Sequence, residues 1–261
     1  MAKATTTKVS SFLISRIKGI IFDLDNTLYN YEPAHRAGLI ASHKKYPVNS
    51  SFAKYVAKYE TARINNEQFL FGTGSSHNRL LYFQRMLEAE ADVMGDTTNS
   101  CFSPSLALEL TSSYWIAFIK AMRLEPNLRE TLLFLVRRYK LGILSDLTAD
   151  IQFAKITAHR LWPFFDAIVV SEEAGAEKPS IVGLRMLLRK MHLHANQVIL
   201  VGDNPAADGL CAQQLRIPFI QIVRPDMQHM KKTGKGASNK SGIKIWRKIK
   251  KLQELKTILA A

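Results

Sequence analysis

The sequence has very little cysteine and no long apolar run. Only Cys101 and Cys211 occur among 261 residues, too few for a disulfide framework or a cysteine-based zinc site. No apolar stretch approaches the ~20 residues that a membrane-spanning helix needs, and the N-terminus lacks the apolar segment of a secretory signal. We therefore expect a protein without transmembrane segments that works in a reducing, cytoplasmic compartment.

Acidic residues are scarce relative to basic ones, and this imbalance is concentrated at one end of the chain. The sequence has 36 Lys and Arg against 22 Asp and Glu, a net charge of +14. Residues 224–261 hold 11 basic and two acidic residues, so +9 lies in this segment and +5 in the other 223 residues. The hydrophobic content of 47% is ordinary for a globular protein, which excludes wholesale disorder. The basic character therefore belongs mainly to the C-terminal segment.

Short apolar segments alternate with helical patterns in two parts of the chain. The expected strands are 17–22, 141–144, 167–170, 198–201 and 218–223, and helices are expected at 128–139, 148–159, 180–191 and 208–215. Strands separated by helices of this length predict a parallel sheet. Residues 33–122 show only helical patterning. The fold class predicted is an α/β, Rossmann-like parallel sheet flanked by helices, with an all-helical cap inserted after the first strand.

The C-terminal segment is predicted to form a linker and a basic amphipathic helix. Residues 225–242 are rich in Gly, Ser, Lys and Asn, and the pattern of 243–261 favours a helix. One face of this helix would carry Ile245, Ile249, Leu252, Leu255 and Leu259. Two interpretations stay open: the apolar face docks on the protein's own core, or the basic side chains contact a polyanion such as nucleic acid or an anionic membrane.

Four clusters of polar side chains follow the expected strands. They are Asp23-Leu24-Asp25-Asn26-Thr27, Ser145-Asp146, Lys178-Pro179, and Gly202-Asp203-Asn204 with Asp208. The carboxyl ends of parallel strands meet at one edge of a sheet, and ligands bind there in open α/β folds. We therefore expect the four clusters to converge on one site.

The residue types in these clusters suit phosphate chemistry. Of Asp23 and Asp25, one carboxylate can attack an electrophile while the other moves a proton. A hydroxyl at Ser145 can hold a phosphate oxygen, and Lys178 can neutralise a dianion. Further carboxylates converging with Asp23 would form an oxygen-ligand site that suits Mg²⁺. Each residue alone is more often a helix cap, a turn residue or a surface side chain, so the joint pattern is what favours a functional site.

The four clusters resemble the sequence motifs of the haloacid dehalogenase (HAD) superfamily. The matching segments are Phe22-Asp23-Leu24-Asp25-Asn26-Thr27-Leu28, Leu144-Ser145-Asp146, Ser171-Glu172-Glu173 leading to Lys178-Pro179, and Gly202-Asp203-Asn204-Pro205 with Asp208. The helical insert is similar to the cap of the phosphoglycolate phosphatase-like and 5′-nucleotidase-like branch. This resemblance implies a catalytic core at 1–31 and 123–224, a cap at 32–122, and an additional basic segment at 225–261.

The resemblance also implies catalytic roles for two aspartates. Asp23 would be the nucleophile that forms an aspartyl-phosphate. Asp25 would protonate the leaving alcohol and then activate water. Dehalogenases lack an acid at the position of Asp25, so its presence favours phosphoester chemistry over dehalogenation.

Binding roles follow from the same resemblance. Ser145 and Lys178 would hold the phosphoryl oxygens, and Mg²⁺ would be bound by Asp23, the backbone carbonyl of Asp25, Asp203 and Asp208. The implied activity is Mg²⁺-dependent hydrolysis of a small phosphomonoester of the nucleotide or sugar phosphate type. A sugar phosphomutase, and a non-catalytic module that presents the basic segment, are the alternatives.

One position departs from the family pattern. Asp146 stands where the family commonly has Asn. A further negative charge beside the phosphate site would disfavour a bound dianion, unless this carboxylate points away from it.

Overall fold

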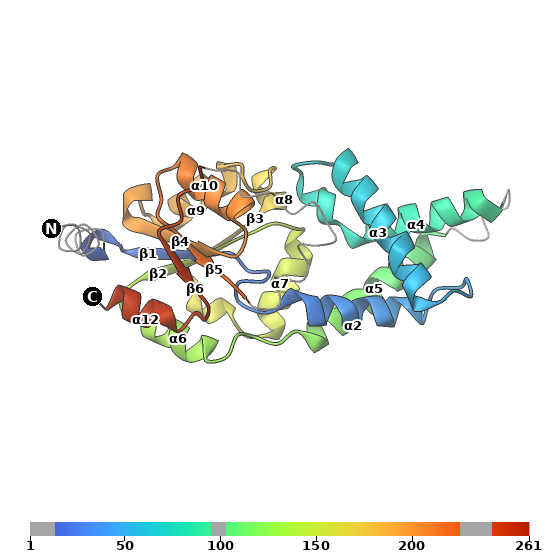
Figure 1. Ribbon diagram of the computed structural model, residues 1–261, viewed down its shortest axis with the longest axis horizontal. Coiled ribbons are helices and arrows are strands. Elements are labelled where there is room, and N and C mark those ends of the chain that lie inside the picture. Colours follow the sequence, from blue (N-terminus) through green and yellow to red (C-terminus); the bar gives the residue numbers. More distant parts are fainter. Residues whose placement is uncertain (1–13, 95–102, 225–241, 261) are drawn as a thin grey trace.

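A six-stranded parallel sheet forms the centre of the protein (Figure 1). The computed structural model describes residues 14–94, 103–224 and 242–260. The strand order is β3-β2-β1-β4-β5-β6, and every neighbouring pair is parallel. The strands are β1 (Gly19–Phe22), β2 (Lys140–Ser145), β3 (Ala167–Val170), β4 (Val198–Gly202), β5 (Phe219–Ile222) and β6 (Arg247–Ile249). The predicted α/β, Rossmann-like fold is confirmed.

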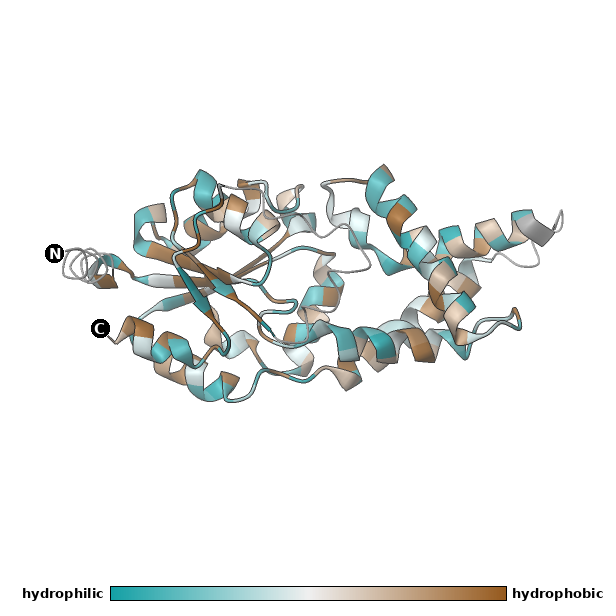
Figure 2. Cartoon of the chain, in the orientation of Figure 1, coloured by the Kyte–Doolittle hydropathy of each residue, from teal (hydrophilic) through white to brown (hydrophobic). Residues whose placement is uncertain are grey.

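Helices cover both faces of the sheet, which explains why its strands are almost uniformly apolar. Side chains alternate between the two faces, so Ile20 and Phe22 pack in one buried cluster and Ile21 packs in the other. Figure 2 shows the hydrophobic residues concentrated on the central strands. The helices that flank the sheet are α6 (Leu128–Leu135), α7 (Ala149–Ala158), α8 (Ser171–Ala174), α9 (Val182–Met191) and α10 (Leu210–Gln214).

A helical segment follows β1 and extends away from the carboxyl ends of the strands (Figure 1). It comprises α2 (Tyr31–His43), α3 (Phe52–Phe69), the short 3₁₀ turn η1 (Gly74–His77), α4 (Arg79–Met94) and α5 (Pro104–Ala121). Its described residues, 31–94 and 103–121, contain no β-strand. The interior is strongly aromatic, with fully buried side chains at Tyr55, Tyr59, Tyr82, Phe83, Tyr114 and Phe118.

The two connections between the helical segment and the sheet run side by side. Tyr29 forms an isolated bridge with Leu124, and the backbone N–H of Glu125 donates to the carbonyl of Leu28 at 2.9 Å. The predicted boundaries at residues 31/32 and 122/123 therefore fall next to a place where the outgoing and returning chains are hydrogen-bonded to each other. Their status as domain boundaries stays a prediction.

The C-terminal segment differs from the single helix expected at 243–261. Residues Arg247–Ile249 form β6, which pairs with β5, and α12 (Glu254–Leu259) packs on α6. The expected apolar face is largely buried all the same, at Ile249, Leu252, Leu255 and Leu259. The sequence does not predict this short strand, because its pairing with the edge of β5 depends on tertiary structure. By pairing there, β6 covers the exposed row of unpaired backbone groups along β5.

The expected linker falls mostly on residues 225–241, outside the described residues. The basic side chains of Arg247, Lys248 and Lys250 are exposed, and their contact with a polyanion stays a prediction. Within the described parts of the chain, none of the helices has the length and apolar character required to span a bilayer.

Candidate active site

The structure brings the predicted residues Asp23, Lys178, Asp203 and Asp208 together at the carboxyl edge of the sheet. Lys178 Nζ lies 2.6 Å from Asp23 Oδ1 and 2.7 Å from Asp208 Oδ1. Asp23 directly follows β1, and its N–H still donates to the β4 carbonyl of Val201 at 2.9 Å. This hydrogen bond to β4 fixes the backbone of Asp23 at the point where the chain leaves β1 and the loop begins.

Asp23 is buried among like charges. Thr27 Oγ1 donates to its Oδ2 at 2.8 Å, and the residue is only 6% exposed. Burial raises the pKa of Asp23 well above its usual range; the ion pair with Lys178 offsets part of this, while Asp208 and Asp203 raise the pKa further. A single lysine thus does not balance the negative charge here.

Three carboxylates meet closely enough to hold a metal ion. One oxygen from each of Asp23, Asp203 and Asp208 lies within 4.8 Å of the others. Burial, and next the charge of Asp208, raise the pKa of Asp203 to about 7. Hard oxygen donors with an excess of negative charge suit Mg²⁺. The donor set therefore fits the cation that the sequence predicted.

The local backbone explains the spacing of the acidic residues after β4. A Cβ on Gly202 would lie 2.3 Å from Asp208 Oδ2, so only glycine leaves room for this carboxylate against the strand. The N–H of Asn204 donates to the same oxygen at 3.1 Å. Residues Pro205–Gly209 form a π-helical turn, a rare geometry that occurs often at functional sites. This turn directs Asp208 back toward the sheet.

Asp25 points to a different set of partners. Lys155 Nζ lies 2.8 Å from Asp25 Oδ1, Gln152 Nε2 donates to Oδ2 at 3.1 Å, and the hydroxyl of Tyr29 donates to Oδ1. Burial would raise the pKa of Asp25, but the ion pair and hydrogen bonds lower it on balance, with Lys155 first among them. The Asp25 carboxylate is not part of the three-carboxylate cluster, so any role in metal binding would fall to its backbone carbonyl.

Sequence reasoning missed Lys155 and Gln152. Both side chains are fully buried on α7, and Ile156 of the same helix face is buried too. The detectable signal was a lysine and a glutamine on the helix face that should be apolar, within ten residues of Ser145. Such polar residues on a buried face need partners, and here the partners are Asp25 and Ser145.

Ser145 is buried at the end of β2 and contacts the Asp25 side of the site. Gln152 Nε2 donates to Ser145 Oγ at 2.6 Å. The neighbouring Asp146 instead turns toward the Lys178 loop, where its Oδ1 accepts the backbone N–H of Lys178 at 3.1 Å. Its Oδ2 lies 3.9 Å from Lys178 Nζ. The unusual aspartate therefore helps to fix the loop that carries Lys178.

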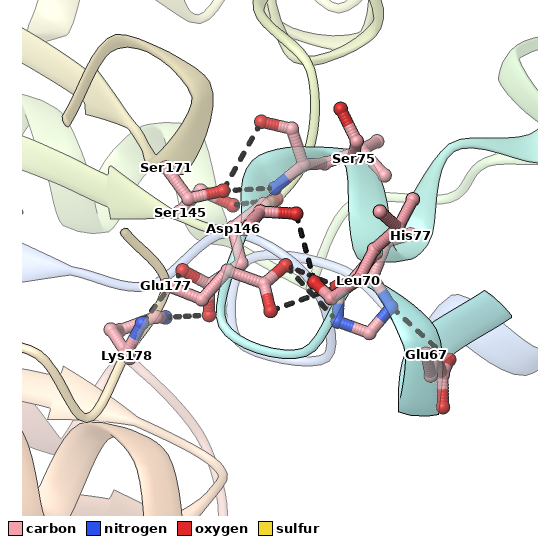
Figure 3. A network of polar contacts seen from close by, with 12 residues as sticks. Glu67, Leu70, Ser75, His77, Ser145, Asp146, Ser171, Glu177 and Lys178 are labelled. Carbon is pink, nitrogen blue, oxygen red and sulfur yellow. Dashed lines mark hydrogen bonds and ion pairs between the residues drawn. The ribbon is translucent and has the colours of Figure 1, made fainter. Parts of the chain in front are cut away.

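A loop of the helical segment contacts this same Lys178 loop. Ser76 Oγ donates to both carboxylate oxygens of Glu177, at 2.8 and 2.9 Å. In Figure 3, His77 lies between Glu177 and Glu67; its Nε2 is 3.4 Å from Glu177 and its Nδ1 is 3.1 Å from Glu67. The approach is close, since a Cβ on Gly74 would lie 2.7 Å from the backbone of the α8 residue Glu172. The helical segment is thus docked beside the site.

Arg224 also supports the loop that carries the aspartates, and sequence reasoning did not single it out. Its Nε donates to the carbonyl of Asn26 at 2.8 Å and its Nη2 to the carbonyl of Thr27 at 3.0 Å. Glu125 forms an ion pair with the same guanidinium. Asn26 has a positive φ of 63°, so Arg224 stabilises the tight turn between Asp25 and Thr27.

Comparison with known proteins places the chain in a family. The profile of the haloacid dehalogenase-like hydrolases matches residues 20–222. A ribulose-1,5-bisphosphate 5-phosphatase from Halopiger xanaduensis is 35% identical over 196 residues, which cover 72% of this chain and 77% of the relative. A glyceraldehyde 3-phosphate phosphatase from Methanocaldococcus jannaschii is 27% identical, covering 82% of this chain and 88% of the relative.

The fold is also found among solved structures. A 2-haloacid dehalogenase from Pseudomonas syringae superposes with a TM-score of 0.69 at 21% identity, covering 94% of this chain and 98% of that chain. The family profile matches most of the chain, and the curated relatives agree with it. The chain belongs to the haloacid dehalogenase-like hydrolases and is an enzyme of the hydrolase class.

Proposed function

We propose that this enzyme hydrolyses a small phosphomonoester, with Mg²⁺, through an aspartyl-phosphate on Asp23. The observation that carries the proposal is the meeting of Asp23 with Lys178 and two further carboxylates at the carboxyl edge of the sheet. The curated relatives support phosphatase activity, since both are named as phosphatases of sugar phosphates. We infer a substrate of the sugar or nucleotide phosphate type.

In the first step, an oxygen of Asp23 attacks phosphorus and the bond to the leaving alcohol breaks. Asp25 supplies the proton that the alcohol takes. The ion pair with Lys155, 2.8 Å away, favours the ionised form of Asp25 in the free protein. Asp25 must therefore take up a proton from solvent when the substrate binds, and the negative charge of the bound phosphoryl group favours this uptake. In the second step, Asp25 accepts a proton from water as that water attacks phosphorus, which releases phosphate and regenerates Asp23.

Two side chains would hold the phosphoryl oxygens during both steps. Lys178 lies 2.6 Å from Asp23 and can reach an oxygen of a group bound to it. Ser145 Oγ, at the end of β2, is held in place by its hydrogen bond from Gln152. Together they would orient the phosphoryl group for attack in line with the leaving oxygen.

Asp23, Asp203, Asp208 and the backbone carbonyl of Asp25 are the groups that would hold Mg²⁺. The bound cation would offset the charge of the phosphoryl oxygens and reduce their repulsion of the attacking carboxylate. The helical segment would close over the site and exclude water, since its loop at residues 70–78 already contacts the core at Glu177.

The test is phosphate release from a panel of sugar, nucleotide and small organic phosphomonoesters with Mg²⁺. We expect turnover of several substrates, loss of activity in EDTA and recovery on adding Mg²⁺. Ca²⁺ should restore activity poorly, because its coordination shell is larger and less regular. Full activity in EDTA would disprove the metal requirement, and isomerisation of a sugar phosphate without phosphate release would favour a phosphomutase.

A further inference from the structure

Arg79, the first residue of α4, is a buried cation that forms no ion pair in the part of the chain that the structure describes. Its side chain is 7% exposed. Its Nη1 donates to the carbonyl of His77, its Nη2 donates to the hydroxyl of Tyr31, and its Nε has no hydrogen-bond partner. None of the ion pairs among the described residues involves Arg79. A charge that is buried without a counter-ion is costly.

The groups around Arg79 are aromatic and neutral. Its guanidinium carbon lies 5.2 Å from the ring centre of Tyr82, 5.9 Å from that of Tyr114 and 5.3 Å from that of Trp115. Burial raises the pKa of both tyrosines, so neither is an anion at neutral pH. Burial, and next the charge of Arg79, lower the pKa of His35 to about 3. Cation–π contacts stabilise the guanidinium in part, but no acidic side chain within residues 14–94, 103–224 and 242–260 forms an ion pair with it.

Arg79 borders the candidate active site on the side of the helical segment. The ring of Trp115 contacts both Arg79 and Lys155, whose Nζ lies 5.2 Å from the ring centre and is paired with Asp25. Tyr31, the hydroxyl partner of Arg79, donates its backbone N–H to Asn26 in the loop of the two aspartates.

The residues just before Arg79 reach the opposite wall of the site. Ser76 and His77 contact Glu177, which precedes Lys178 in the chain. Arg79 is therefore linked through Trp115 to Lys155, the partner of Asp25, and through His77 to Glu177, the neighbour of Lys178. A substrate whose phosphoryl group sits at Asp23 would extend toward the helical segment, where Arg79 is a buried charge without an ion pair among the described residues.

We propose that Arg79 binds a second anionic group of the substrate, a phosphate or a carboxylate, at the end away from the group that is hydrolysed. The planar guanidinium fork suits such anions because it can donate two parallel hydrogen bonds, and its Nε is unused by the protein. This proposal rests on the proposed phosphatase function. It assigns the substrate to the class of small phosphomonoesters that carry a further anionic group.

The experiment compares matched substrates with and without the second anion. The pairs are fructose bisphosphate with fructose monophosphate, and phosphoserine with phosphoethanolamine; p-nitrophenyl phosphate serves as a substrate without a second anion. In at least one of these pairs, we expect the wild type to prefer the compound that carries the second anionic group. Arg79→Gln should lower kcat/KM for that member by roughly 10- to 100-fold, mainly through KM, as expected for a lost hydrogen bond to a charged group.

Two variants separate binding from folding. Arg79→Lys keeps the charge without the fork and should retain part of the preference. Arg85→Gln is the matched control on the same helix, because Arg85 donates to Asn66 within the helical segment, and it should leave the preference unchanged. Equal losses with Arg79→Gln on p-nitrophenyl phosphate and on the preferred substrate would indicate a structural role and overturn the proposal. A wild type that shows no preference in turnover or in binding would overturn it as well.

A binding measurement distinguishes this proposal from the proposed function. Calorimetric titration in EDTA reports affinity for fructose bisphosphate and fructose monophosphate without turnover. If the wild type hydrolyses none of the esters but binds the bisphosphate more tightly, and Arg79→Gln abolishes the difference, the phosphatase proposal fails while the anion site stands. If turnover is normal but neither affinity nor kcat/KM depends on Arg79, the anion site fails alone.

Discussion

Asp23 and Asp25 are two residues apart in one loop, yet they occupy opposite electrostatic environments. Asp23 shares a single lysine with Asp208, and Asp203 lies close by. Asp25 has a fully buried lysine of its own, Lys155, and two further hydrogen-bond donors. The pKa of Asp23 is raised and that of Asp25 is lowered, although burial raises both. The difference comes from the count of charges around each carboxylate.

This contrast explains how identical side chains can take different roles. The Asp23 side has an excess of negative charge and is completed by a cation and a substrate. The Asp25 side is balanced within the protein, so its carboxylate is held in place before any ligand binds. What separates the two environments is the position of the partners: Lys155 lies on α7, whereas Lys178 lies in the loop before Pro179 and Asp208 in the turn after β4. Three predictions test the contrast.

The largest effect is expected for Asp23→Asn. Because an amide cannot act as the nucleophile, kcat should fall by at least ~10³-fold. The metal-free protein should not lose stability, since one of the crowded negative charges is removed and Lys178 keeps its pair with Asp208. Steady-state kinetics and thermal unfolding in EDTA measure both. Asp150→Asn, an exposed position on α7, is the control, and near wild-type turnover by Asp23→Asn would exclude Asp23 as the nucleophile.

The next effect concerns the stability of the Asp25 side. Lys155→Met leaves Asp25 buried without its counter-ion, and breaking a buried pair in this way costs about 3–5 kcal/mol. Urea denaturation should show this loss in the free energy of unfolding. Lys190→Met, which breaks the exposed pair between Lys190 and Glu173, should cost no more than about 1 kcal/mol. Adding Asp25→Asn to Lys155→Met should recover part of the loss, and equal costs for the two lysine variants would contradict the contrast.

The Asp23 side could be predicted from the sequence, whereas most of the Asp25 side could not. Asp23, Lys178, Asp203 and Asp208 each follow a strand, and the geometry of a parallel sheet requires such positions to converge. Lys155 is anchored by a helix, and its partner is fixed only when α7 packs against the loop after β1. A lysine in a helix is normally a surface residue, so its burial depends on tertiary contacts that periodicity does not reveal.

The same distinction holds for the fold. The strands β1 to β5 and the helices α6, α7, α9 and α10 could be predicted because each is a local pattern of apolar residues. Strand β6 was missed because it consists of three residues whose pairing with β5 depends on the rest of the sheet. The burial of Arg79 likewise could not be predicted from the sequence. It depends on how the helical segment packs, and so does the absence of an ion pair between Arg79 and any described acidic residue.

The smallest expected effect is a dependence of stability on pH that arises from Asp203. Its pKa of about 7 in the folded protein lies above its ordinary value of 3.8, so the folded state binds the proton more tightly than the unfolded state. The stability that the folded state gains from this protonation of Asp203 is fully present below about pH 4 and is lost as the pH rises through 7. The metal-free protein should therefore melt a few degrees lower at pH 8 than at pH 5, relative to Asp203→Asn, which lacks this titration.

Metal binding should reverse this trend, because Mg²⁺ binds the ionised carboxylate. Adding Mg²⁺ should raise the melting temperature more at pH 8 than at pH 5, and the increase should be small in Asp203→Asn. Thermal unfolding of both proteins at the two pH values, with EDTA or Mg²⁺, provides the comparison. If the metal-free wild type gained stability over this pH range relative to Asp203→Asn, the excess of negative charge inferred for the Asp23 side would be wrong. If Mg²⁺ stabilised both proteins equally, Asp203 would not be among its ligands.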